Sequence, residues 1–474
     1  MKSLVPKSIS LALCLCWSAP STVAFADESS DSIQAFLEQQ VQVDPDLGMV
    51  VALVDEVGSK VLSAGNLGNG TDQKVNGDTL FEIGSITKTF TALLLQDTVA
   101  RGEMKFDDPV AMYLPDSVKM PSRDGKAITL LDLATQTSGL PREVNNLTSV
   151  GDLPANPYAD YTAERLYAFL SDHTLSRAPG VEFGYSNPGM ALLGHAIERK
   201  AGQNFETLLV DRICRPLGMD STRIKLAPEL KARLAAGHGQ RRQPAPNWEF
   251  QVYDGAGGLR STANDMLKYL SANLGLTPSA LTPLMEKMHP IRFRGPPPYG
   301  ETAMPWMDRG ISVQIGKQLL GHAGGTGGYE TFIGFDKTAK RGVVVLANQQ
   351  GGLITEKLGW FILEGVPLTP EITAGMSAVG DAALVGVGLK LEYDRQTRTI
   401  QATQVIPNSP ASEAGLAAGF VVTKINGVPT AGKSLEHCAS LIRGKTGTNV
   451  RLEVADPPGQ NVNTIELTRR KLQI

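Results

Sequence analysis

The chain has 474 residues, of which 42% are hydrophobic and 20% charged, so it can form two or three globular domains that each bury a core. Its net charge of −3 and its lack of a long basic run argue against a nucleic-acid partner. Two of the four cysteines lie in the first sixteen residues. The other two, Cys214 and Cys438, fall in different expected domains, so no disulfide framework is predicted.

Residues 1–26 have the order of a secretory signal peptide. Two lysines precede an apolar run at residues 9–17, and small residues ending in Ala24-Phe25-Ala26 follow. The run is too short to span a membrane, so we expect cleavage after Ala26, a secreted or periplasmic protein, and no transmembrane segment in the mature chain. The two cysteines of the run leave a lipoprotein open, although leucine rather than a small residue precedes each of them.

The mature chain is expected to begin with a helix at residues 32–40, followed by strands at residues 48–55 and 60–65. The two strands are separated by a short polar turn and are rich in β-branched and apolar residues, which predicts a hairpin within an antiparallel sheet. A buried helix is then predicted from Ser85 to about Arg101, because apolar residues dominate the stretch and a glycine ends it.

Ser85 and Lys88 are the first candidate catalytic pair. Their i,i+3 spacing places both side chains on one face of the predicted helix. A serine needs a base to become a nucleophile, and a lysine serves when desolvation or a neighbouring cation lowers its pKa. Free N–H groups at the helix start would also favour a negative carbonyl oxygen. Taken alone, Ser-x-x-Lys more often marks a capping serine followed by an exposed lysine.

Two later motifs change that interpretation. Tyr185-Ser186-Asn187 and His322-Ala323-Gly324 follow in the order of the Tyr-x-Asn and Lys-Thr-Gly elements that accompany Ser-x-x-Lys in serine β-lactamases and penicillin-binding proteins. Over residues 30–365 the chain resembles the class C β-lactamase family and its relatives, the serine DD-peptidases, esterases and D-aminopeptidases. The resemblance implies an α/β fold of the α+β type, with an antiparallel sheet and a helical lobe, for a catalytic domain at residues 27–365.

The resemblance also implies roles for individual residues. Tyr185 would relay the proton from Ser85 to the leaving group, if the neighbouring cation favours a phenolate or a shared proton, and Asn187 would position the substrate and Lys88. The N–H groups of Ser85 and Gly325 would form the oxyanion hole. Residues expected to meet the substrate along the edge strand or at its acidic end are His322, Gly324, Gly325 and Asn348. No metal or cofactor is implied.

Two residues depart from the class C pattern. Glu143 stands where those enzymes have a glutamine amide, which puts recognition of the usual amide side chain in doubt. His322 stands where most have a lysine, and a histidine near its ordinary pKa of about 6.5 is mostly neutral at pH 7. Charge assistance to an anionic β-lactam would then be lost. Related DD-peptidases and D-aminopeptidases do have histidine at this position.

Other elements of the catalytic domain are less distinctive. Residues 128–140 are predicted to form a capped helix that runs into a glycine turn, and residues 292–299, with three prolines in a row, a surface loop. Further helices and strands are expected at residues 163–170, 189–201, 310–315, 329–335 and 343–348.

Residues 366–381 are rich in proline, glycine and small residues and are predicted to be a linker. The remainder, residues 382–474, resembles a bacterial PDZ domain, although Phe420 follows its Gly-x-x-x-Gly turn where an aspartate is usual. The resemblance implies a carboxylate-binding loop and strand that would hold a protein C-terminus. The residues expected to bind it are Gly386, Val387, Gly388 and Leu389. A module that only packs on the catalytic domain is the alternative.

Three functions remain open at this stage. The first is a secreted serine hydrolase related to β-lactamases, acting through an acyl-enzyme on Ser85. The second is a DD-carboxypeptidase, D-aminopeptidase or esterase on the same scaffold, which His322 and Glu143 favour. The third is an inert scaffolding protein whose PDZ domain binds chain ends, and the intact Ser85, Lys88, Tyr185 and Asn187 argue against it.

Overall fold

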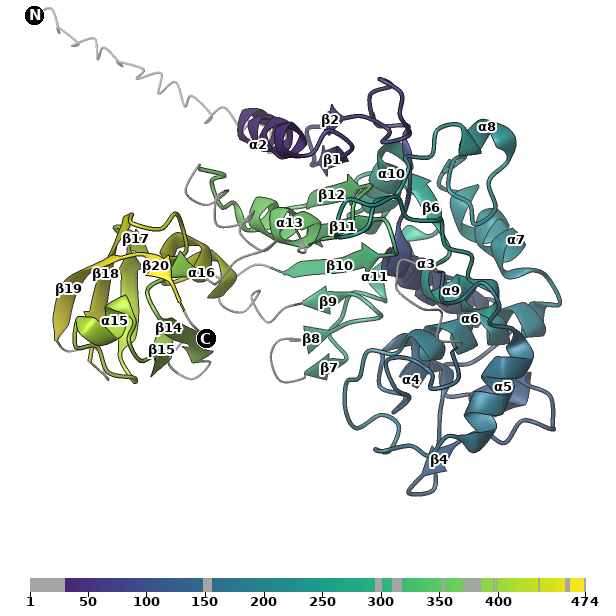
Figure 1. The fold of residues 1–474 in the computed structure, drawn as a ribbon. Helices are drawn as coiled ribbons and strands as arrows, with labels where there is room; N and C mark the ends of the chain where they lie inside the picture. Colours follow the sequence, from purple (N-terminus) through teal and green to yellow (C-terminus); the bar gives the residue numbers. More distant parts are fainter. Residues whose placement is uncertain are drawn as a thin grey trace, which may run out of the picture.

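The computed structural model shows a larger part made of a sheet and many helices, and a smaller β-rich part at the C-terminal end (Figure 1). It describes residues 30–147, 156–294, 301–308, 318–351, 354–369, 373, 385–394, 397, 399–433, 435–456 and 461–472. The expected signal peptide, the strand expected at 310–315, most of the proline loop and most of the expected linker lie outside these residues.

The larger part is organised on an eight-stranded antiparallel sheet in the order β2-β1-β12-β11-β10-β9-β8-β7. The strands are β1 (Gly48–Val54), β2 (Ser59–Gly65), β7 (Phe293–Arg294), β8 (Glu301–Thr302), β9 (Met307–Asp308), β10 (Leu319–Gly325), β11 (Glu330–Asp336) and β12 (Arg341–Ala347). Because β1 pairs with β12, strands from the two ends of the domain's sequence lie side by side in the sheet. The expected hairpin β1–β2 is confirmed.

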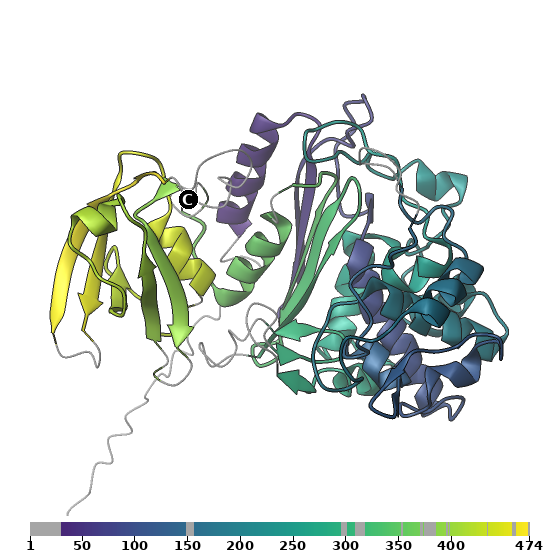
Figure 2. The same cartoon turned by 60° about the horizontal axis from the view of Figure 1, so that its bottom comes forward.

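Helices cover both faces of this sheet, which explains why every residue of β1 is buried. Alternate residues of β1 enter different cores: Val50 and Ala52 pack toward the helical lobe, while Met49 and Val51 pack toward the opposite face. Helices α2 (Ser30–Val43) and α13 (Ile354–Glu364) cover that opposite face (Figure 2). The expected helix at residues 32–40 is therefore present and somewhat longer.

The nucleophile segment is a single 3₁₀ turn, η1 (Gly84–Ile86), that continues into helix α3 (Thr87–Ala100). Helix α3 is buried along almost its whole length, with its end at Arg101 as expected. The strand before it, β3 (Leu80–Glu82), pairs with β6 (Arg260–Thr262) from the distant glycine-rich stretch. This pairing brings two segments about 180 residues apart to the same end of α3.

The helical lobe packs on the other face of the sheet. A Thr129 capping box starts α4, which is shorter than the helix predicted at residues 128–140 because Gln136 and Gly139 adopt positive φ in the turn that follows. The other elements outside the main sheet are η2 (Val110–Tyr113), β4 (Ser122–Arg123), β5 (Lys126–Ala127), α4 (Leu130–Ala134), α5 (Ala163–Asp172), α6 (Asn187–Ala201), α7 (Phe205–Leu209), the π-helix η3 (Val210–Cys214), α8 (Pro228–Lys231), η4 (Gln251–Tyr253), α9 (Asp254–Gly257), α10 (Ala263–Asn273) and α11 (Thr282–Glu286).

The C-terminal part has a small antiparallel sheet in the order β14-β15-β16-β18-β19, with its own hydrophobic core. Phe420, which departs from the usual PDZ sequence, is buried in this core. The elements are β13 (Val385–Gly386), β14 (Leu389–Asp394), β15 (Thr399–Val405), α15 (Pro410–Glu413), β16 (Val421–Ile425), β17 (Val428–Pro429), α16 (Leu435–Ile442), β18 (Asn449–Ala455), β19 (Val462–Thr468) and β20 (Arg470–Lys471).

Helix α16 faces α13 of the larger part (Figure 1). The rings of Phe361 on α13 and His437 on α16 have centroids 6.3 Å apart, and Leu441 packs against the core between α13 and the sheet. The two parts therefore touch through a helix pair. Among the described residues, no helix is both long and apolar enough to cross a membrane.

Candidate active site

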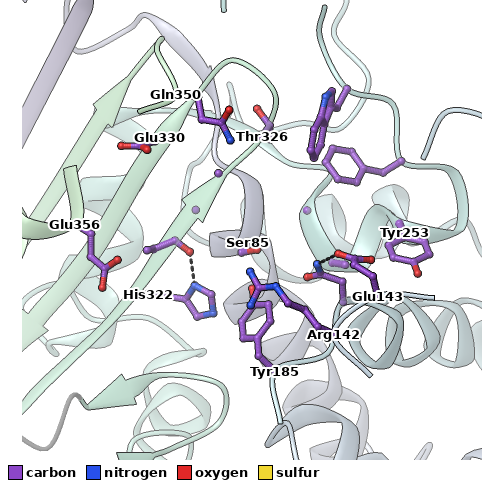
Figure 3. A pocket seen from close by; sticks show the side chains of 18 of the residues that line it. Ser85, Arg142, Glu143, Tyr185, Tyr253, His322, Thr326, Glu330, Gln350 and Glu356 are labelled. Atoms are coloured by element: carbon purple, nitrogen blue, oxygen red, sulfur yellow. Dashed lines mark hydrogen bonds between the residues drawn. The ribbon is translucent and has the colours of Figure 1, made fainter. Parts of the chain in front are cut away.

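A cavity of about 540 Å³ lies between the edge of strand β10 and the helical lobe, with Ser85 on its floor (Figure 3). The motif residues Tyr185, Asn187, His322, Gly324 and Gly325 all line it, although they come from separate segments of the chain. The fold thus brings together Ser85 and five of the residues that the sequence nominated.

Ser85 and Lys88 are in hydrogen-bond contact, with 2.9 Å between Ser85 Oγ and Lys88 Nζ. Lys88 also donates to the carbonyl oxygen of Ala256 at 2.7 Å, which fixes the direction of its side chain. The side chain of Lys88 is completely buried, whereas Ser85 is partly accessible from the cavity. The alternative of an exposed lysine is therefore wrong.

Burial changes the chemistry of Lys88. Desolvation lowers its pKa to about 7, with the carboxylate of Glu143 opposing the shift and the guanidinium of Arg142 adding to it. A substantial fraction of this lysine is neutral at pH 7, whereas a solvated lysine with its ordinary pKa near 10.4 is almost fully protonated. Lys88 is thus able to accept the proton of Ser85.

Tyr185 is the second group that faces Ser85. Its side chain lines the cavity together with Ser85, and Lys88 Nζ lies 4.9 Å from the centre of its ring. Burial raises the pKa of Tyr185 to about 12, against the opposing effects of Ser85 and Arg142. The phenol is protonated at neutral pH, so Tyr185 is placed to donate a proton, and a resting phenolate is not favoured.

The backbone near Gly325 comes very close to the nucleophile turn. A Cβ atom on Gly84 would lie only 2.7 Å from the backbone nitrogen of Gly325, and Gly84 itself has a φ of +49°. A Cβ on Gly324 would lie 2.1 Å from the carbonyl oxygen of Ile83. Glycine is therefore needed at both positions for the turn and strand β10 to meet.

His322 is buried and neutral. Desolvation, together with the nearby charge of Lys88, lowers its pKa to about 3. Its Nδ1 donates to the carbonyl oxygen of Ala323 at 2.7 Å, so the neutral ring presents an unprotonated Nε2. Among the described residues Nε2 has no hydrogen-bond partner. His322 offers the cavity a lone pair, and not the positive charge that a substrate carboxylate prefers.

Asn187 begins α6 and is held by Glu143. Its Nδ2 donates to Glu143 Oε1, which also accepts a hydrogen bond from Tyr158 Oη at 2.9 Å. The helix is capped by Ser186, whose Oγ accepts from Gly189 N. Ser186 therefore has the capping role, and the side chain of Asn187 is left to face the cavity.

Asn348 does not reach the cavity, contrary to its expected contact with the substrate. Its side chain is fully buried, and Oδ1 accepts a short hydrogen bond from the backbone N–H of Gly48. Its Nδ2 donates to the carbonyl oxygens of Asp46 and Ala236. Asn348 thus ties the start of β1 to the loop after α8, a structural task.

An aromatic wall closes the side of the cavity near Glu143, and sequence reasoning did not identify it. Tyr158 stacks on Tyr253 with 4.6 Å between ring centroids and on Phe250 with 5.4 Å, and its ring meets Trp248 edge-on at 5.5 Å. The one available signal was the clustering of three aromatics within residues 248–253, in a chain with only 6% aromatic residues.

A buried ion pair supports this wall and the nucleophile turn from behind. Arg260 donates to Glu82 Oε1 at 3.0 Å and to the carbonyl oxygen of Trp248 at 2.6 Å. Glu82 also accepts from Trp248 N at 3.0 Å. Glu82 belongs to the segment that precedes Ser85, so its position in the motif reflects support of the strand and not chemistry.

The expected peptide-binding residues of the C-terminal part lie together at the junction of β13 and β14. Gly388 has a φ of +85°, and a Cβ there would lie 2.1 Å from Ser409, so only glycine fits. The side chain of Val387 is buried in the core. Helix α16 lies beside β14, as the groove helix of a PDZ domain would.

Comparison with known proteins agrees with this geometry. The beta-lactamase family profile matches residues 35–365, and a PDZ domain profile matches residues 401–456. The chain belongs to the beta-lactamase family. The match to this family covers well more than half of the chain. The β-lactamase-like fold and the PDZ domain predicted from the sequence are confirmed.

Two of the curated relatives carry different named activities. The chain is 30% identical over 247 residues to the D-alanyl-D-alanine-carboxypeptidase/endopeptidase AmpH of Escherichia coli K12, which covers 52% of this chain and 62% of that protein. It is 25% identical over 348 residues to a beta-lactamase of Pseudomonas fluorescens, covering 67% of this chain and 92% of that protein. The chain therefore spans about three fifths of the length of the first relative.

Solved structures show the same division. A class C beta-lactamase from Rhodobacter sphaeroides is 26% identical with a TM-score of 0.61, and the match covers 72% of this chain and 100% of that one. The D-alanine carboxypeptidase AmpC from Burkholderia cenocepacia is 27% identical with a TM-score of 0.60 and the same coverage. The fold alone thus does not distinguish the two activities.

Proposed function

We propose that this protein is a secreted serine hydrolase that cleaves amide, β-lactam or ester carbonyl compounds through an acyl-enzyme on Ser85. The observation that carries the proposal is the 2.9 Å contact between Ser85 Oγ and a fully buried Lys88 whose pKa is about 7. A neutral amine at hydrogen-bond distance from a serine hydroxyl is the requirement for activating that serine at neutral pH.

Acylation then follows from the positions of three side chains. Neutral Lys88 takes the proton of Ser85 Oγ while Oγ bonds to the substrate carbonyl carbon, and the N–H groups of Ser85 and Gly325 stabilise the resulting oxyanion. Tyr185, protonated at neutral pH, gives its proton to the leaving nitrogen or oxygen as that bond breaks. Lys88 returns a proton to Tyr185, and water later hydrolyses the acyl-enzyme.

Peptidase or esterase activity is favoured over efficient class C hydrolysis of β-lactams. The buried His322 is neutral and presents an acceptor, so an anionic β-lactam carboxylate gains no charge assistance there. β-Lactam hydrolysis is the second candidate, because Ser85, Lys88 and Tyr185 would supply the nucleophile, the base and the proton donor that acylation by a β-lactam also requires.

An intact-mass time course with excess benzylpenicillin tests the proposal. We expect a penicilloyl adduct on the wild-type protein and none on Ser85→Ala. A persistent adduct indicates a penicillin-binding peptidase, and loss of the drug with a transient adduct indicates a β-lactamase. A fluorophosphonate probe is used in parallel, and equal labelling of wild type and Ser85→Ala would refute Ser85 as the nucleophile.

The remaining parts of the chain complete the proposal. The signal-like order of residues 1–26 supports cleavage after Ala26 and a periplasmic or secreted location. The C-terminal domain is proposed to bind the C-terminus of a protein between β14 and α16, using the junction at residues 386–389. An inert scaffold is disfavoured by the intact contact of Ser85 with Lys88.

A further inference from the structure

The two sides of Ser85 differ in what they offer a substrate. In Figure 3, Glu143 and Tyr253 lie on one side of Ser85 and His322 on the other. The rings of Tyr185, the proposed proton donor, and His322 have centroids 6.3 Å apart, and we place the leaving group toward His322. The acyl part of the substrate therefore faces Glu143 and the aromatic wall.

Glu143 has an unsatisfied oxygen in this acyl region. Its Oε1 accepts hydrogen bonds from Tyr158 and Asn187, whereas its Oε2 is buried and has no partner among the described residues. No lysine, arginine or histidine of the described chain forms an ion pair with Glu143. A buried carboxylate oxygen without a donor is costly, and a bound cation would compensate it.

The aromatic wall offers a second feature that suits a cation. Tyr158, Trp248, Phe250 and Tyr253 line the cavity beside Glu143. Aromatic faces attract ammonium groups through the ring quadrupole and also take apolar groups, so the wall accepts both parts of an amino-bearing acyl group. An uncharged amide on the substrate would interact less strongly than an ammonium group with the free carboxylate oxygen and with the ring faces.

The charges of the cavity lining favour the same ligand. Three carboxyl side chains line the cavity, from Glu143, Glu330 and Glu356, against one guanidinium, from Arg142. The guanidinium lies 5.0 Å from the centre of the Tyr185 ring and forms no ion pair with Glu143. His322 adds no positive charge. Glu330 and Glu356 lie on the opposite side of Ser85 from Glu143 (Figure 3), so Glu143 is the lining carboxyl that faces the acyl group.

We infer that Glu143 and the aromatic wall form a subsite for a protonated amino group on the acyl part of the substrate. The substrate class is amides, peptides or esters whose acyl group carries a free amine. The inference rests on the proposed acyl-enzyme function. It makes Glu143 a specificity-determining residue that binds the substrate, with Tyr158 and Asn187 holding its carboxylate in place.

Ampicillin and benzylpenicillin are a matched pair for this test, since ampicillin adds one amino group to the acyl side chain of the same penam and phenyl ring. The second-order acylation rate is measured by intact mass for each compound. We expect wild type to prefer ampicillin by about tenfold or more, the size of a hydrogen bond to a charged group. Glu143→Gln should bring the ratio close to one.

Glu249→Gln is the control variant, because Glu249 is an exposed carboxylate located in the chain between Trp248 and Phe250 and lines a different cavity. This variant should keep the wild-type preference for ampicillin. A wild-type ratio near one, or a ratio unchanged by Glu143→Gln, would overturn the inference. A fall in the ratio in both variants would also overturn it, because it would reflect overall charge.

Fluorophosphonate labelling separates failure of the subsite from failure of the nucleophile. If the probe labels Ser85 but neither penicillin does, the comparison is repeated with D-alanine p-nitroanilide and its N-acetyl derivative. No preference for the free amine, or no hydrolysis of either compound, then overturns the amino subsite and leaves Ser85 as the nucleophile. If the probe fails to label Ser85, the proposed function and the inference fall together.

Discussion

The floor of the cavity and its two sides differ in how closely they follow the family pattern. On the floor, Ser85, Lys88 and Tyr185 keep the residue types of the motifs; Ser85 and Lys88 are hydrogen-bonded, and Lys88 Nζ lies 4.9 Å from the centre of the Tyr185 ring. On the sides, Glu143 and His322 replace the residues of the class C pattern, and both present buried atoms without partners among the described residues. The residues for acyl transfer are therefore retained on the floor, whereas the residues that would recognise the substrate have changed on the sides.

Among the substitutions that test this comparison, replacing Lys88 should have the largest effect on the acylation rate. Lys88→Met keeps an unbranched apolar stem in a fully buried position but removes the base, so the acylation rate should fall by about a thousandfold. Rapid mixing with a fluorescent penicillin measures it, and the unfolding midpoint checks that the variant is folded. A folded variant that loses less than about tenfold would mean that another group takes the proton of Ser85.

The pH dependence of acylation should show how Glu143, on one side of the cavity, affects the pKa of Lys88. Because the active form of Lys88 is neutral and its pKa is about 7, the rate should fall tenfold per pH unit below that value and level off above it. Glu143 raises the pKa of Lys88, so Glu143→Gln should shift the fall in acylation rate to lower pH. A rate that stays constant between about pH 5 and pH 8 would contradict Lys88 as the base.

The smallest effect is expected on the His322 side. His322→Lys supplies a cation beside the leaving group, so benzylpenicillin should gain about tenfold over its methyl ester, which lacks the carboxylate. The ratio of the two acylation rates is the measurement, and His322→Gln is the neutral control. An equal gain in the lysine and glutamine variants would show that charge at this position does not decide recognition.

Local sequence predicted the pairing of Ser85 with Lys88 on the floor, because only three positions separate them. The i,i+3 separation places Ser85 and Lys88 on one face of the helix that begins there, and glycine is required at Gly84 for the turn to pass Gly325. The hairpin β1–β2, the buried helix α3 and the C-terminal PDZ domain were also predicted from periodicity or resemblance and are confirmed.

Long-range packing decided what the sequence could not. Asn348 was expected at the substrate, but the close approach of β1 and the loop after α8 uses its whole side chain. The aromatic wall joins Tyr158 to residues 248–253, across a separation that no local pattern encodes. The aromatic wall is therefore a product of tertiary packing.

The sequence by itself determined which groups are available for chemistry: a serine, a lysine and a tyrosine in motif order, and a glutamate and a histidine in place of the usual amide and lysine. The tertiary structure decided the protonation states of those groups. Burial lowers the pKa of Lys88 to about 7 and of His322 to about 3 and raises that of Tyr185 to about 12. Desolvation depends on every segment that excludes water, and no single segment of sequence contains that information.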